Sequence, residues 1–149
     1  MMSESANLSS FIVKFDQLAE IKFRNCGGMQ FHIQPIYYPD STQSSGYHTG
    51  RGSVGTSELS FAYGTVDGTH SGGGQSLSDW LLKTTQLGEA LDKRNGRISL
   101  QSSEGKTLAQ WKILKAWPCR WEGPTLGMEN AGLSIDTITF AHEGLERLK

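Results

Sequence analysis

The stretch RNGRISLQSSEGKTLAQWKILKAWP, residues 94–118, has the pattern of a β-hairpin. Ile98 and Leu100 alternate with polar residues, as they do in a strand with one buried face. The residues SSEG (102–105) supply turn chemistry, and a second alternating run follows them. Pro118 is expected to end that run, because proline has no N–H to donate to a sheet.

Further segments with strand character lie on both sides of this hairpin. Each alternates apolar and polar residues, or carries β-branched and aromatic residues between turn signals. Pro35 predicts an edge or bulged position in one of them, because proline cannot donate a ladder hydrogen bond. The segments are FIVKF (11–15), EIKFRNC (20–26), QFHIQPIYY (30–38), ELSFAYGTV (58–66) and LSIDTITFAHEGLERLK (133–149).

The closing segment changes the side on which its apolar residues fall. Ile135 lies on one face of a period-2 pattern, whereas Ile138 and Phe140 lie on the other. We interpret the segment as a strand packed on both sides, with a β-bulge expected near Asp136–Thr137.

One segment is predicted to be a helix. Ser76 and Asp79 have the spacing of a capping box, and Gly88 is expected to stop the helix. A helix this short is not stable alone, so its Trp80 face is expected to lie on a sheet. The positions with helical spacing are Leu77, Trp80, Leu81, Thr84 and Leu87.

These elements predict a mainly β fold: an antiparallel β-barrel or sandwich of about seven strands with one docked α-helix. The length of 149 residues suits a single domain, residues 1–149, and the 18 glycines suit a turn-rich β protein. Residues 1–10 are expected to form a flexible arm. Residues 39–57, rich in Ser, Gly and Thr, are expected to form a long loop, which is disordered or functional in most compact domains.

Charge and composition exclude several classes of protein. The net charge of −1 argues against a generic nucleic-acid binder, although a neutral total can hide a polarised surface. No apolar run is long enough to span a membrane, and the N-terminus does not resemble a secretory signal. Cys26 and Cys119 are therefore expected to be free thiols in a soluble protein made in the cytoplasm.

No motif predicts a metal, a cofactor or a catalytic group. The histidines, which are His32, His48, His70 and His142, lack the spacing of metal ligands. The glycine-rich loops lack the lysine of a phosphate-binding loop. His142 and Glu143 would point to opposite faces of a strand, so a histidine bound to a backbone carbonyl is the favoured interpretation over a catalytic pair. A hydrolase that uses these two residues remains an alternative.

The tryptophans leave a second alternative open. Trp111, Trp117 and Trp121 would stack on bases or sugars if they shared one exposed face. Packing in the core or at a subunit interface is favoured, because no basic segment surrounds them. A ligand-binding β-barrel is the alternative.

The order of several separated motifs resembles the phage tail-tube protein family. That family includes the inner-tube proteins of contractile phage tails and of phage-derived contractile injection systems, and it is related to the tube protein of type VI secretion. The resemblance covers about Leu77 to Leu148. The motifs are Asp79–Trp80, Asn95–Gly96, Trp111, Ala116–Trp117–Pro118, Gly123–Pro124–Leu126, Asn130 and Ala141–His142–Glu143–Gly144–Leu145.

The N-terminal half fits the family more loosely. Ala62–Tyr63 replaces a basic pair that commonly ends the corresponding strand, and GYHTGRGSV (46–54) replaces a stretch that resembles Lys-Leu-Pro-Gly. These departures leave room for a tube-initiating or baseplate-proximal paralogue in place of the main tube subunit.

The resemblance implies a structural subunit without catalytic activity or cofactor, which forms stacked hexameric rings with a hollow lumen. The implied partners are further copies of the chain, a surrounding sheath protein, baseplate or hub and tube-terminator proteins at the ends, and protein or DNA cargo. It implies assembly in the bacterial cytoplasm into a phage tail or injection particle that is released or anchored to a membrane. We expect His142, Glu143 and Gly144 to be structural, and loop 39–57 to contact the adjacent ring. The candidates for that contact are Tyr47, His48 and Arg51.

Overall fold

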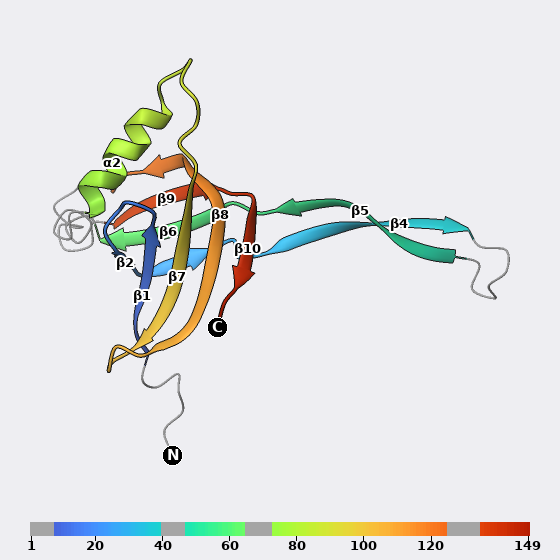
Figure 1. The fold of residues 1–149 in the computed structure, drawn as a ribbon, viewed down its shortest axis with the longest axis horizontal. Coiled ribbons are helices and arrows are strands. Elements are labelled where there is room, and N and C mark those ends of the chain that lie inside the picture. Colours follow the sequence, from blue (N-terminus) through green and yellow to red (C-terminus); the bar gives the residue numbers. More distant parts are fainter. Residues whose placement is uncertain (1–7, 40–46, 65–72, 125–134) are drawn as a thin grey trace.

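The computed structural model describes residues 8–39, 47–64, 73–124 and 135–149 (Figure 1). They form a β-barrel with a helix docked against it and a long hairpin that projects away from it on the opposite side from the helix. The strands are β1 (Leu8–Phe15), β2 (Ile21–Phe23), β3 (Asn25–Gly27), β4 (Phe31–Pro39), β5 (Tyr47–Thr56), β6 (Leu59–Gly64), β7 (Arg94–Ser102), β8 (Thr107–Glu122), β9 (Ile135–Ala141) and β10 (Gly144–Arg147), and the helix is α2 (Gly73–Thr84).

The barrel consists of two antiparallel sheets that share strand β8. The first sheet has the order β2-β1-β7-β8-β10, and the second has the order β8-β9-β6-β3. The 16 residues of β8 pair with β7 and β10 along their first part and with β9 along their second part. The chain passes from β2, which pairs with β1, directly into β3, which pairs with β6, and between them the N–H of Arg24 donates to the carbonyl of Ala62 at 2.7 Å. This continuous segment connects the two ends of the strand order. The predicted antiparallel β fold with a docked helix is confirmed.

Aromatic side chains occupy the centre of the barrel. The ring of Phe140 lies 4.6 Å from Phe15, 5.5 Å from Trp80 and 5.8 Å from Phe61, measured between centroids. Contacts of this kind stabilise a core beyond the area that they bury. The largest side chains with less than 2% exposure are Trp80, Phe15, Phe61, Phe140, Leu59, Ile98, Ile113, Ile138 and Pro118.

The expectation that Pro118 ends its strand is wrong. Strand β8 continues to Glu122, and the register against β9 shifts between Pro118 and Arg120. The bulge leaves Cys119 without a ladder partner, so Pro118 lies at the edge of an irregularity, where proline is tolerated within a sheet. Pro118 is buried and lies opposite Phe140.

The bulge expected near Asp136–Thr137 lies on the partner strand instead. Strand β9 keeps an unbroken register with β6 from Ile135 to Phe140, and the irregularity is the one in β8. Asp136 occupies the core-facing position that precedes Ile138, which explains the change of face in the sequence. The closing segment is also two strands, because β9 ends at Ala141 and, after a break at His142–Glu143, the chain continues in the same direction along β8 as β10.

Helix α2 begins earlier than the capping-box pattern indicates. It runs from Gly73 to Thr84, so Ser76 lies inside its first turn and Leu87 lies beyond its end. The helix ends at Thr84, four residues before the predicted stop at Gly88, which has a positive φ of 95° in the loop that follows. Trp80 faces the sheet as expected, with only 1% of its surface exposed.

Two further segments differ from expectation. Residues 47–56 of the expected loop form strand β5, which pairs with β4 in a two-stranded hairpin, while residues 40–46 lie outside the described residues. Leu8–Ser10 of the expected arm belong to β1, and residues 1–7 also lie outside the described part. The described residues therefore contain ten strands in place of about seven.

Candidate assembly surfaces

The hairpin β4–β5 exposes apolar side chains along its length. Every residue of β4 is exposed, and the register shifts between Ile33 and Pro35 as the proline predicts. An isolated two-stranded hairpin is marginally stable in water, and a row of exposed apolar side chains marks an interaction surface. The hairpin side chains are Phe31 (68% exposed), Ile33 (39%), Ile36 (49%), Tyr37 (66%), Tyr38 (48%) and Val54 (60%).

The root of the hairpin is clamped to the barrel. Gln30 Nε2 donates to Ser57 Oγ at 2.6 Å, and Thr56 Oγ1 donates to the carbonyl of His142 at 3.4 Å. Gly28 has a φ of 90°, and a side chain there would collide with the carbonyl oxygen of Glu58. The hairpin therefore leaves the barrel in a direction set by local contacts.

His142 is the centre of this clamp. Its Nδ1 accepts a hydrogen bond from the N–H of Gly144 at 3.1 Å, so the ring proton lies on Nε2 and is donated to the carbonyl of Ser57 at 2.7 Å. The expected histidine bound to a backbone carbonyl is confirmed. Glu143 is exposed and pairs with Lys93 at 2.8 Å, and that hydrogen bond lowers the pKa of Glu143. His142 and Glu143 therefore bind different partners, which favours structural roles for both over a catalytic pair.

The substitution His142→Ala is expected to disturb both stability and assembly. It leaves the carbonyl of Ser57 and the N–H of Gly144 without their side-chain partner, which costs about 1–3 kcal/mol of unfolding free energy. The root of the hairpin loses one anchor, so assembly should weaken further than the loss of stability explains. Urea unfolding and sedimentation measure the two effects. The control is Glu143→Gln, which removes an exposed ion pair of small energetic value and should leave both near wild type.

The first sheet has two incomplete edges. Strand β10 pairs only with β8 within the described residues, and β1 extends past the residues that β2 covers. Unpaired strand edges attract further strands, and a closed ring of subunits removes them. This sheet is therefore suited to pairing from one subunit to the next.

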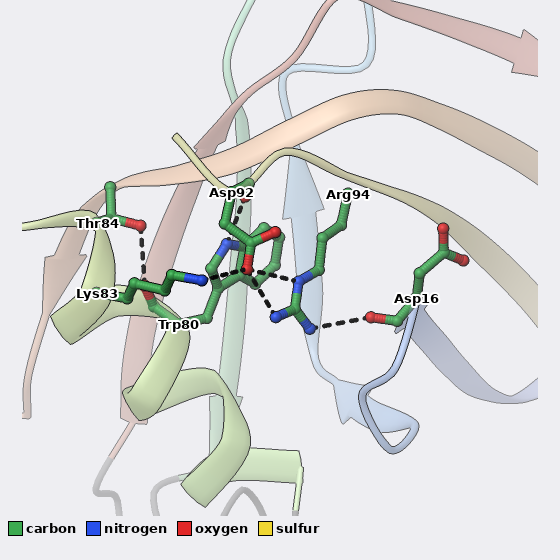
Figure 2. A network of polar contacts seen from close by, with 6 residues as sticks. All are labelled: Asp16, Trp80, Lys83, Thr84, Asp92 and Arg94. Atoms are coloured by element: carbon green, nitrogen blue, oxygen red, sulfur yellow. Dashed lines mark hydrogen bonds and ion pairs between the residues drawn. The ribbon is translucent and has the colours of Figure 1, made fainter. Parts of the chain in front are cut away.

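A polar network fixes α2 against the start of β7 (Figure 2). The indole N–H of Trp80 donates to the carbonyl of Asp92 at 2.8 Å, and the guanidinium of Arg94 lies 5.1 Å from the centre of the Trp80 ring. Arg94 also donates to the carboxylate of Asp92 at 2.8 Å and to the carbonyl of Asp16 at 3.0 Å. The hydrogen bond from Arg94 lowers the pKa of Asp92. This stabilisation is present above the unfolded pKa of Asp92 and is lost as the pH falls through the lower, folded pKa.

Asn95 and Gly96 adapt β7 to both of its neighbours. The side-chain oxygen of Asn95 accepts the N–H of Lys115 at 3.0 Å, and Lys115 has a φ of 49° at a register shift in β8. Gly96 lies opposite Phe15, whose ring would come within 2.6 Å of a side chain at that position. The pair therefore has structural roles, one in a bulge and one in close packing.

The tryptophans do not share one exposed face. Trp111 and Trp117 pack against the core, and Arg147 lies over the ring of Trp111 at 5.3 Å. Trp121 is half exposed (49%) near the end of β8, and an added side chain at Gly123 would lie 2.9 Å from its ring. The arrangement favours packing over a stacking platform for a ligand.

The other predicted positions lie apart from one another. Asp79 is exposed on α2, Pro124 follows the end of β8, and Asn130 lies outside the described residues. Tyr47 begins β5, His48 lies 5.8 Å from the ring of Tyr38, and Arg51 is exposed. The exposure of the apolar residues of β4 was not predicted, although the consecutive run IYY (36–38), which breaks the period-2 alternation, is a signal for it.

Both cysteines carry free thiols. Cys26 is half-buried, and burial raises its pKa to about 11, so the thiol stays protonated. Cys119 is exposed, and its pKa is also raised, mainly by partial burial. No cluster of metal-binding side chains occurs within the described ranges, nor does any helix there have the length and apolarity to cross a membrane.

Comparison with known proteins gives the family. The family model described as T4-like virus tail tube protein gp19 matches residues 8–146. The chain belongs to this tail tube family. The comparison with curated protein sequences gives no match.

Solved structures share the tail tube fold at low sequence identity. One is the extended sheath-tube complex of PVC, an extracellular contractile injection system (TM-score 0.75, 21% identity, 93% of this chain and 88% of that chain). A second is the tube-terminating cap of the anti-feeding prophage (TM-score 0.75, 19% identity, 94% and 88%). A third is Hcp1 from Flavobacterium johnsoniae (TM-score 0.57, 10% identity, 93% and 94%). The predicted family is confirmed.

Proposed function

We propose that this tail tube protein is the repeating subunit of an inner tube, built from stacked hexameric rings with a hollow lumen. The observation that carries the proposal is the hairpin β4–β5, whose apolar side chains are exposed in the described part of the subunit. A contact with a neighbouring copy removes these side chains from water. In this arrangement the hairpin contacts the adjacent ring, and the hydrogen bonds at its root fix the direction in which it projects.

The ring itself closes through the first sheet. The free edge of β10 in one subunit pairs with the open part of β1 in the next, so that six sheets form one continuous wall. The face of this sheet that points away from the core then lines the lumen. Helix α2 covers the core on the side of the barrel away from the hairpin.

The partners follow from the position of such a tube. The structures with the same fold include a sheath-tube complex, a tube terminator and a baseplate, so we propose equivalent partners for this chain. The particle assembles in the bacterial cytoplasm and is then released or anchored, and its lumen carries protein or DNA.

A position at the baseplate is the second candidate. Ala62–Tyr63 stands where the family commonly has a basic pair, and Ala62 lies on β6 opposite Asn25. The fold also covers 97% of a chain in the anti-feeding prophage baseplate structure, at 18% identity and a TM-score of 0.72. An initiator would form single rings that do not elongate without a main tube subunit.

Negative-stain microscopy of the purified full chain tests the proposal. Six-fold rings that stack into tubes are expected for the main subunit, and single rings for the initiator. A protein that stays monomeric at high concentration would contradict both assignments.

A further inference from the structure

The outward face of the first sheet carries a row of basic side chains. Lys14 of β1 lies directly opposite Arg97 of β7, and Arg97 lies directly opposite Lys112 of β8. Directly opposed residues in antiparallel strands point to the same face, with Cβ atoms about 4.5–5.5 Å apart. The neighbours Phe15, Ile98 and Ile113 are buried, so the three cations point away from the core.

The row is poorly neutralised by the chain itself. Like charges placed directly opposite one another destabilise a sheet. None of the three cations makes an ion pair with another described residue. Glu146 of β10 lies opposite Lys112 but makes no ion pair with it within the described residues. Lys22 adds a further exposed cation to this face, beside Ile12.

The row borders a hollow in the surface. A space of about 380 Å³ is lined by the three cations together with Phe15, Asp16, Asn95 and Gly96. The side-chain oxygen of Asn95 is engaged by the N–H of Lys115, so its amide group remains as a donor. Asp16 is the one acid in the lining, so the cations outnumber it.

We propose that Lys14, Arg97 and Lys112 form a phosphate-binding site for a nucleic-acid backbone that passes along this face. A guanidinium matches a phosphate through paired N–H groups, and two lysines beside it supply further charge. No exposed aromatic or apolar side chain lines the hollow, so contacts are to the backbone and do not depend on base sequence. The net charge of −1 does not oppose this, because the positive charge is concentrated on one face.

The location of the site in an assembly rests on the proposed function. If the first sheet lines the lumen, the row repeats around every ring and the cargo is a polyanion. Contacts of this kind depend on charge and release counterions, so they hold a chain without fixing its register.

Salt-dependent binding of a labelled oligothymidylate of about 20 nucleotides tests the site on the full chain, because such a length exceeds the footprint of one domain. Fluorescence anisotropy at several salt concentrations gives the slope of log K against log salt. The triple variant Lys14→Gln, Arg97→Gln, Lys112→Gln is expected to bind on the order of tenfold more weakly and to lose about 2 from the slope, or about 0.7 for each phosphate contact. Lys106→Gln removes an exposed cation in the β7–β8 turn and serves as the matched control, with an unchanged slope.

Three outcomes decide the proposal. An unchanged slope in the triple variant overturns it. Competition by inorganic polyphosphate supports recognition of phosphate groups. If polyphosphate competes more weakly than unlabelled oligonucleotide of equal charge, the preferred ligand is nucleic acid. Competition by polyglutamate as strong as by oligonucleotide overturns it in favour of an acidic polypeptide.

Microscopy of the same samples separates the site from the proposed function. The substitutions change side chains on the face of the sheet and leave the backbone groups of its edges unchanged, so the triple variant should still form rings. If the chain never forms rings but its binding of oligonucleotide depends on Arg97, the phosphate-binding site is supported and the proposed tube function is rejected.

Discussion

The substitution Trp80→Ala is expected to lower the free energy of unfolding by about 3–5 kcal/mol. Trp80 is 1% exposed and packs against Phe15 and Phe140 at 5.1 and 5.5 Å. Its removal opens a cavity between α2 and the barrel, and it also frees the carbonyl of Asp92 and the guanidinium of Arg94 from their contacts with the indole. A loss of this size is a large part of the stability of a small domain. Urea unfolding of the unassembled protein measures it.

Two variants locate the origin of this loss. Trp80→Phe keeps a ring in the core but loses the hydrogen bond to Asp92, so it should cost about 1–2 kcal/mol. Leu82→Ala, at a position of the same helix that is 64% exposed, should cost less than about 0.5 kcal/mol. Equal losses for Trp80→Ala and Leu82→Ala would show that α2 does not hold the barrel through its Trp80 face.

Replacing three hairpin side chains with serine is expected to abolish assembly while the subunit stays folded. Phe31, Tyr37 and Val54 are 68%, 66% and 60% exposed, so Phe31→Ser, Tyr37→Ser and Val54→Ser should each change the unfolding free energy by about 0.5 kcal/mol or less. If a neighbouring copy buries them, their loss removes roughly 5 kcal/mol from each contact, or between about a thousand- and ten-thousand-fold in association constant. Microscopy and sedimentation velocity measure the assembly.

The matched control changes three exposed leucines away from the hairpin. Leu82→Ser, Leu87→Ser and Leu91→Ser remove a similar apolar surface at positions that are 64%, 98% and 44% exposed. Tubes should form normally from this variant. Normal tubes from the hairpin variant as well would reject the hairpin as the contact between subunits.

The sequence predicts the barrel and the docked helix because both follow from local periodicity. The alternation around Ile98 and Leu100 yields β7, and the helical spacing around Trp80 yields α2. The start of the helix differs from the prediction, because a capping-box pattern at Ser76 and Asp79 does not reveal that the helix continues for three further residues toward the N-terminus. Pro118 was misjudged because a bulge depends on the partner strand.

The hairpin was missed for a different physical reason. Its strand β5, YHTGRGSVGT, is rich in Gly, Ser and Thr and has little intrinsic preference for a strand. Pairing with β4 gives it its conformation, and such pairing is not visible in a local window. The role of His142 was predicted correctly as far as a backbone carbonyl partner. Its position at the root of the hairpin could not be predicted locally, because it depends on a contact between residues 57 and 142, which are far apart in sequence.

The membership of β8 in both sheets has a mechanical consequence. A subunit in a tube that is driven against a barrier carries load along the axis of the particle. The two sheets cannot slide apart unless the pairings of β8 with β7, β10 and β9 are broken, and all of them belong to one continuous strand. Force that enters at one sheet is therefore carried through covalent bonds into the other, and the subunit should yield as a whole instead of splitting along a seam between its sheets.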